Sequence, residues 1–294
     1  MRYNTGMETP VYSDVRPSPI AGTWYPGRAA ELRAQVEGFL QKAAAPALSG
    51  EILGLVVPHA GLVYSGLTAA HAFKTLIGSA FTRVVILSPS HQYYREPLLT
   101  SGHEAYGTPL GQVPVDHDAL NALRMLLNAT GGPEITPVRR DREHSLEIEL
   151  PFLQVVLPQG FKLVPLMLVN QSLDLVRALS DALAGYLLTL HPEEKTLLVA
   201  SSDLSHFYPE NQANLLDKRV LAALEAMDIS ELFMLNTSGR GQACGMTPIL
   251  TVLRACRSLG ADKLVIADYR TSADVTHDAD SVVGYGSAVI TKTV

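Results

Sequence analysis

An apolar run that ends in a short polar loop recurs along this chain, and a helical segment usually follows it. Three such runs end in Pro58-His59-Ala60-Gly61, in Ser88-Pro89-Ser90-His91 and in Ser201-Ser202-Asp203-Leu204-Ser205-His206. The run Arg83–Leu87 is apolar without alternation, which is typical of a strand covered on both faces. Strands that alternate with helices predict a largely parallel sheet with right-handed crossovers.

These patterns predict an α/β fold: a single domain with a largely parallel central sheet flanked by helices. We expect residues 1–18, which are polar and contain proline, to be irregular, and residues 19–294 to form the domain. Pro97–Val115 is predicted to be a β-hairpin excursion. The remaining predictions are strands at Leu53–Val57, Arg83–Leu87, Phe161–Val169, Thr196–Ala200, Lys263–Asp268 and Ser281–Thr291, and helices at Ala29–Ala45, Gly66–Ile77 and Ser172–Leu190.

Composition narrows the class of protein. Hydrophobic residues make up 47% of the 294 residues and charged residues 18%, which excludes a disordered chain. The net charge of −6 argues against a nucleic-acid partner, and no apolar run is long enough to span a membrane. The first 18 residues lack the order of a signal peptide, and two cysteines are too few for a disulfide framework. We therefore expect a soluble, cytoplasmic protein.

His59, His91 and His206 each follow the end of a predicted strand. Open α/β sheets bind ligands beyond the carboxyl ends of their strands, so these three side chains are expected to converge. A single loop histidine more often only hydrogen-bonds a neighbouring carbonyl group, but three at equivalent places favour a site. The other histidines that we expect to be bystanders are His71, His103, His117, His191 and His277.

Two acidic residues lie near histidines in the sequence. Asp203 precedes His206 by three residues, so in a helical turn its carboxylate would orient the imidazole, or it would simply cap a helix. His144 lies at a predicted helix start, where it would act as an acid or base with Glu147 one turn later. The alternative for the segment around His144 is a charged first turn favoured by the helix dipole.

The two cysteines differ in their surroundings. Cys256 lies on an apolar helical stripe and is expected to be a buried small hydrophobe. Cys244 lies between glycines just before Thr247-Pro248, which is typical of a helix N-cap and first turn. A thiol near a helix N-terminus has its thiolate favoured, which would make Cys244 a ligand or a nucleophile. An inert cysteine is the alternative.

At these residues the chain resembles the Memo family, called AmmeMemoRadiSam system protein B in microbes. The resemblance spans nearly the whole chain, and no single motif in it is specific alone. Its motifs are Ala21-Gly22-Thr23-Trp24-Tyr25-Pro26, Val57-Pro58-His59-Ala60-Gly61, Tyr64-Ser65-Gly66, Ser88-Pro89-Ser90-His91, Glu143-His144-Ser145-Leu146-Glu147, Ser201-Ser202-Asp203-Leu204-Ser205-His206, Cys244-Gly245 and Asp280-Ser281-Val282-Val283-Gly284-Tyr285-Gly286.

The resemblance implies a fold similar to the class III extradiol ring-cleavage dioxygenases, which use iron held by two histidines and a carboxylate. It implies His59, His91 and Cys244 as metal ligands, with His144, Asp203 and His206 as catalytic residues in the same pocket. Cys244 stands where the dioxygenases have a glutamate ligand. A thiolate shifts the preference toward copper(I), zinc or thiolate-bound iron, which argues against ring cleavage.

Three functions follow as hypotheses. The first is a redox or dioxygenase-like enzyme with iron(II), or alternatively copper or zinc, that acts on an unidentified small molecule. The second is a hydrolase or transferase with Cys244 as nucleophile. The third is a non-catalytic protein that handles metal or binds a partner, and the microbial family name points to a radical-SAM protein as that partner.

Overall fold

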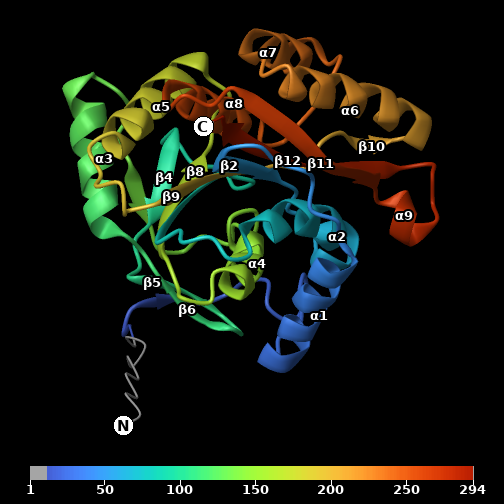
Figure 1. Ribbon diagram of the computed structural model, residues 1–294, viewed down its shortest axis with the longest axis horizontal. Coiled ribbons are helices and arrows are strands. Elements are labelled where there is room, and N and C mark those ends of the chain that lie inside the picture. Colours follow the sequence, from blue (N-terminus) through green and yellow to red (C-terminus); the bar gives the residue numbers. More distant parts are fainter. Residues whose placement is uncertain (1–11, 294) are drawn as a thin grey trace.

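The computed structural model describes residues 12–293, and one mixed sheet forms its centre (Figure 1). The strand order is β10-β12-β2-β9-β3-β8-β4-β7, and β11 pairs with β12. Neighbours among β2, β9, β3 and β8 are parallel, whereas β12 joins β2 in the antiparallel direction. The expected fold, a single α/β domain with a largely parallel sheet flanked by helices, is confirmed.

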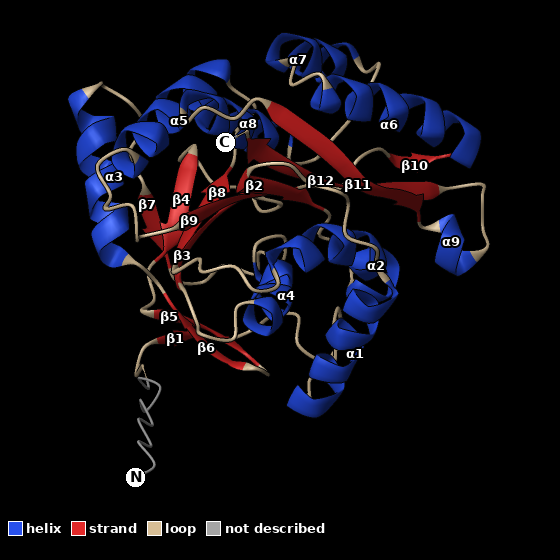
Figure 2. Cartoon of the chain, viewed as in Figure 1, coloured by secondary structure: helices blue, strands red, loops and turns tan. Residues whose placement is uncertain are grey.

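The strands of this sheet are β2 Glu51–Val57, β3 Arg83–Pro89, β4 Leu98–Ser101, β7 Thr136–Val138, β8 Lys162–Leu168, β9 Thr196–Ser201, β10 His206–Tyr208, β11 Lys263–Thr271 and β12 Val282–Lys292. A second, small sheet in the order β1-β5-β6 contains β1 Val15–Arg16, β5 Ala105–Thr108 and β6 Gly111–Pro114. Figure 2 shows this small sheet beside the main one, below it in the view.

Helices cover both faces of the main sheet, with α5 and α8 on one side and α1, α2 and α4 on the other (Figure 1). They are α1 Ala29–Lys42, α2 Leu62–Phe73, α3 His117–Ala129, α4 Leu150–Val156, α5 Leu173–Leu187, α6 Glu210–Glu225, α7 Ile229–Ser238, α8 Met246–Ser258 and the short α9 Ala273–Thr276. Among the described residues, no helix combines the length and apolar character needed to cross a membrane.

The double cover explains why the central strands are apolar without alternation. Val84, Val85, Ile86 and Leu87 of β3 are all fully buried, because side chains on both faces of this strand meet helices. The thiol of Cys256 is also fully buried within α8, and this confirms its assignment to the core. The parallel strands therefore form a rigid base whose carboxyl ends can carry functional loops.

Several predicted boundaries are shifted for local reasons. The helix expected at 66–77 begins earlier, at Leu62, because Gly61 takes the extended backbone of an N-cap residue. The helix expected at 29–45 ends at Lys42, and Ala43 is already extended three residues before Pro46. These shifts move helix ends by three or four residues and leave the order of elements as predicted.

The hairpin prediction for Pro97–Val115 is only partly right. β5 and β6 pair as an antiparallel hairpin, but β4 belongs to the main sheet and pairs with β8 and β7. The expectation of an irregular segment at 1–18 is also wrong in part, because β1 pairs in parallel with β5. Residues 1–11 lie outside the described part of the chain.

Arg16 of β1 ties the beginning of the domain to its centre. Its fully buried guanidinium donates to the Asp141 carboxylate at 2.5 Å and to the Glu147 carboxylate at 2.5 Å, and it also bonds the Glu143 carbonyl oxygen at 2.8 Å. Ser18 and Tyr25 donate to the other oxygen of Glu147. One buried cation therefore holds the loop that runs from Asp141 to Glu147.

Replacing Arg16 tests this dependence. We expect Arg16→Met to lower the free energy of unfolding by about 3–5 kcal/mol, because two buried carboxylates would lose their cation. Urea unfolding followed by circular dichroism measures the change. The control is Arg28→Met, which breaks the exposed pair with Glu31 and should cost at most about 1 kcal/mol. Equal effects of the two substitutions would contradict the interpretation.

Candidate metal centre

The candidate site lies beyond the carboxyl ends of three neighbouring parallel strands. His59 is the second residue after β2 and His91 the second after β3, and β9 lies between these two strands. The loop before α4 adds His144 from a distant part of the sequence. Their positions after the strands predicted that His59 and His91 converge. The sheet topology explains this convergence.

Three imidazoles gather at this point. One ring nitrogen from each of His59, His91 and His144 lies within 4.8 Å of the other two. The ring centroids of His91 and His144 are 4.6 Å apart and nearly stacked, whereas His59 meets both rings edge-on. Nitrogen atoms at these separations can share one metal ion, because imidazole is a common metal ligand in proteins.

The carboxylate of Glu143 orders two of these histidines. It accepts bonds from Nδ1 of His91 at 2.9 Å and from the His91 backbone N–H at 2.6 Å. It also accepts from the backbone N–H groups of His144 and Ser145 and from the Ser145 hydroxyl. Nδ1 of His144 lies 3.4 Å away. A buried acceptor that fixes a histidine in this way leaves the other ring nitrogen free for a metal.

His59 is held from a different side. The ring is buried, and its Nδ1 lies 2.8 Å from the hydroxyl of Ser201 at the end of β9. The backbone N–H of His59 donates to the Asp203 carboxylate at 2.8 Å. Ser201 ends β9 and Asp203 lies in the loop after it, so the end of this strand and its loop fix both the ring and the backbone of His59.

A cavity of about 420 Å³ opens next to the three histidines. Trp24 packs against the His144 ring with centroids 4.1 Å apart, and Tyr64 and Tyr285 also line the cavity wall. His206 and Asp203 line the same cavity. The cavity has the size and the mixed apolar and polar walls of a small-molecule site.

Cys244 lies beside one member of the cluster. Its Sγ is 3.2 Å from Nε2 of His59. The thiol lines a separate cavity of about 290 Å³, whose other polar residues are the amides Gln171, Asn236 and Gln242 together with His206. The structure therefore brings Cys244 close to His59, but the third member of the cluster is His144 and not the predicted Cys244.

His206 does not pair with Asp203, contrary to the expectation from their spacing. Nδ1 of His206 bonds the Leu204 carbonyl oxygen at 2.9 Å, because the segment after β9 is extended and not helical. The carboxylate of Asp203 instead accepts from the backbone of His59 and Ala60. The next residue, Phe207, has φ of 65°, which is strained backbone for a residue with a side chain.

Two further expectations about partners are wrong. Glu147 does not reach His144, because Arg16, Ser18 and Tyr25 occupy its carboxylate. Cys244 does lie directly before α8, but this helix begins at Met246 with Gly245 as its N-cap and not at Thr247, and burial raises the pKa of the thiol. Burial therefore outweighs the helix dipole at Cys244.

The environment sets different protonation states across the cluster. Burial lowers the pKa of His59 well below its ordinary value and that of His144 to about 4, so both are neutral at pH 7. Burial also opposes the charged form of His91, but the hydrogen bond and charge of Glu143 outweigh it and raise its pKa. Burial raises the pKa of Asp203 to about 7, despite the backbone bonds that lower it.

Sequence reasoning gave no role to Glu143, Trp24 or Ser201, although each lies in a motif of the family resemblance. Glu149 contacts Ser201 and was also missed. The only sign of Glu149 in the sequence is that two acids, Glu147 and Glu149, interrupt an otherwise apolar segment. This segment is fully buried in the structure. An acid at a buried position of such a segment needs a partner, so this pattern marks a polar network.

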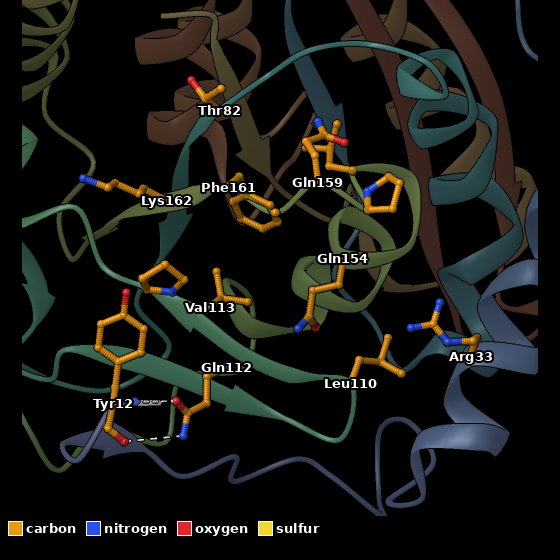
Figure 3. Close-up of a pocket in the computed structure, with 14 residues that line it drawn as sticks. Tyr12, Arg33, Thr82, Leu110, Gln112, Val113, Gln154, Gln159, Phe161 and Lys162 are labelled. Carbon is orange, nitrogen blue, oxygen red and sulfur yellow. Dashed lines mark hydrogen bonds between the residues drawn. The ribbon is translucent and has the colours of Figure 1, made fainter. Parts of the chain in front are cut away.

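A larger cavity of about 530 Å³ lies at the other end of the parallel strands (Figure 3). Thr82 precedes β3, and Phe161 and Lys162 stand at the beginning of β8, where the hairpin and α1 complete the wall. Its side chains offer glutamine amides and the cations Arg33 and Lys162. Among the described residues that line it there is no histidine, cysteine or carboxylate.

The covered parallel sheet and the histidines beyond its strand ends define an α/β protein with a candidate metal centre. The sequence model described as "Memo-like protein" matches residues 16–289. The chain belongs to this family, which confirms the resemblance drawn from its motifs.

Curated relatives agree over nearly the full length. The MEMO1 family protein of Nitrosopumilus maritimus is 33% identical over 277 residues, which cover 93% of this chain and 98% of the relative. That of Methanococcoides burtonii is 33% identical over 284 residues, covering 94% and 100%. That of Aquifex aeolicus is 31% identical over 274 residues, covering 92% and 97%. The alignments leave no large part of these relatives without a counterpart here.

Removing the charge of Glu143 should change how His91 titrates. In Glu143→Gln the pKa of His91 should fall by about 1–3 units, because burial would then act without the opposing carboxylate. NMR titration of the metal-free protein measures this value. The control is Glu37→Gln, which removes an exposed carboxylate on α1 and should leave the pKa of His91 unchanged. An unchanged His91 would show that Glu143 does not set its charge.

The state of Cys244 can be tested with iodoacetamide. The thiol is only partly buried, so the reagent has access, but the raised pKa leaves little thiolate. We expect alkylation of the native metal-free protein at pH 7 to be at least about tenfold slower than that of a free cysteine peptide. Mass spectrometry with time follows the reaction at this residue. Alkylation as fast as that of the peptide would instead support the nucleophile hypothesis.

Proposed function

We propose that this protein binds one transition-metal ion through His59 and His91 and uses it for redox chemistry on a small molecule. The observation that carries the proposal is the approach of three imidazole nitrogens to within 4.8 Å of one another beside a cavity of about 420 Å³. The metal of choice is iron(II), with copper as the alternative.

Two side chains compete to be the third ligand. His144 completes a set of three imidazoles, which suits iron, copper or zinc. Cys244, 3.2 Å from His59, would replace it with a thiolate and favour copper(I) or zinc. Burial raises the pKa of the Cys244 thiol, so the thiol would have to lose its proton when the metal binds.

The carboxylates near the site are engaged elsewhere. Glu143 accepts from Nδ1 of His91 and from backbone N–H groups, and Asp203 accepts from the backbone of His59 and Ala60. A set of two histidines and one carboxylate, as in ring-cleaving dioxygenases, would require one of these acids to give up its bonds. This favours a site with chemistry different from that of the dioxygenases.

The chain's own groups would bind the substrate and move its protons. Trp24, Tyr64 and Tyr285 provide an apolar wall for the bound molecule. Burial lowers the pKa of His206, so its ring is neutral near pH 7 and can accept a proton from the substrate. His144, whose ring is also neutral, would share this role only if Cys244 is the third metal ligand. The metal would supply Lewis acidity and electron transfer beside these groups.

Elemental analysis of protein purified without oxygen tests the proposal. We expect about one equivalent of iron or copper in the wild type and less than about one tenth of it in His59→Ala or His91→Ala, because each loses a ligand. His144→Ala and Cys244→Ala then identify the third ligand. The variant that loses metal lacks a ligand, and the variant that retains metal lacks a residue that does not bind it. His71→Ala is the matched control, because His71 lies on α2 outside the three-histidine cluster and its ring bonds the Ala44 carbonyl.

Full metal content in both His59→Ala and His91→Ala would overturn the proposal. If metal is bound in the wild type, oxygen consumption and turnover across a panel of catechols and other small reductants measure the redox step. Tight metal binding without any turnover would favour the alternative of a metal-handling protein.

A further inference from the structure

The hydroxyl of Ser201 has three polar partners in the base of the site. Its Oγ lies 2.6 Å from the carbonyl oxygen of Ser145, 2.9 Å from Oε1 of Glu149 and 2.8 Å from Nδ1 of His59. All four residues are buried. A hydroxyl group has one proton to donate and two lone pairs to accept with, so the protons among these groups can be counted.

The count has one consistent solution. The Ser145 carbonyl oxygen can only accept, so the Ser201 proton must lie between these two oxygens. The other two contacts then need protons from the partners, namely from the carboxyl group of Glu149 and from Nδ1 of His59. If Ser201 donated to either partner, two oxygens would face each other at 2.6 Å without a proton and leave a buried carbonyl unpaired.

The surroundings of Glu149 and of the far side of His59 agree with this count. Glu149 is 1% exposed, and no lysine, arginine or histidine of residues 12–293 forms an ion pair with it. Burial raises its pKa well above the ordinary value. On the far side of His59, Nε2 lies 3.2 Å from Sγ of Cys244, and a thiol can donate to a free lone pair there.

We propose that Glu149 is a neutral hydrogen-bond donor that acts with Ser201 to hold His59 in the tautomer that carries its proton on Nδ1. This leaves the lone pair of Nε2 free, which is the form in which an imidazole binds a metal. Glu149 and Ser201 are positioning residues, since they act only through His59. The role in metal binding rests on the proposed function, whereas the proton pattern belongs to the metal-free protein.

Infrared spectroscopy of the metal-free protein at pH 7 tests the protonation of Glu149. The difference spectrum between wild type and Glu149→Gln should contain the carbonyl band of a protonated carboxyl group, because other buried acids cancel in the difference. In Ser201→Ala this band should move to higher frequency, since the carboxyl group loses its acceptor. A difference spectrum with only carboxylate bands would overturn the proposal.

Nitrogen NMR of the His59 ring tests the tautomer in the same metal-free samples. The wild type should show a proton on Nδ1 and none on Nε2, and Ser201→Ala should show a mixture of the two forms. The matched control is Ser88→Ala on the neighbouring strand β3. It removes a fully buried hydroxyl that has no hydrogen-bond partner within residues 12–293. A wild-type ring protonated on Nε2 would contradict the proton count.

Titration with iron(II) under anaerobic conditions links the network to binding. We expect the affinity to fall by about 10–100-fold in Ser201→Ala and by about tenfold in Glu149→Leu, which removes the donor. Glu149→Gln supplies an N–H donor to Ser201 and should bind within about threefold of wild type, as should Ser88→Ala. Equal affinity in Ser201→Ala and Ser88→Ala would overturn the positioning role.

A wild type that binds no iron would count against the proposed function alone. The infrared and NMR measurements would still decide the proton pattern, because neither requires a metal.

Discussion

The candidate site depends on the hydrogen bonds that the buried carboxylate of Glu143 accepts. It accepts hydrogen bonds from the loop after β3, through both the ring and the backbone of His91, and from the loop before α4, through His144 and Ser145. Two segments more than fifty residues apart are thereby fixed to one acceptor. A buried carboxylate must be fully hydrogen-bonded. The bonds that stabilise Glu143 in the interior are the same bonds that position the two histidines.

The sheet supplies the remaining order. β2 and β3 flank β9, so the loops that follow them bring His59 and His91 to the same edge. Ser201 at the end of β9 and Asp203 in the loop after it fix His59. His59 and His91 are therefore each held by hydrogen bonds to a neighbouring segment as well as by their own strands. Such a site is preorganised, which lowers the cost of ordering the ligands when a metal binds.

The sequence predicted the parts of this arrangement that depend on local pattern. Apolar runs identified the parallel strands, and the rule for strand ends placed His59 and His91 together. Prediction from the sequence failed where burial and residues distant in the chain determine the hydrogen-bond partners and the pKa of a side chain. The bonds of Glu147 to Arg16 join residues 131 positions apart, and the raised pKa of Cys244 depends on its packing. Neither depends on local spacing, so the helix-dipole and one-turn arguments gave the wrong partners.

The Arg16 cluster has a consequence for the order in which the protein becomes native. Arg16 is 125 residues from Asp141, and β1 also needs β5 before it can pair. During synthesis β1 must remain unpaired until β5 has followed it, and Arg16 lacks a carboxylate partner until Asp141 appears 125 residues later. The loop with Glu143 and His144 reaches its final shape only when this early strand returns to it, so the site forms by closing a long loop and not by local folding.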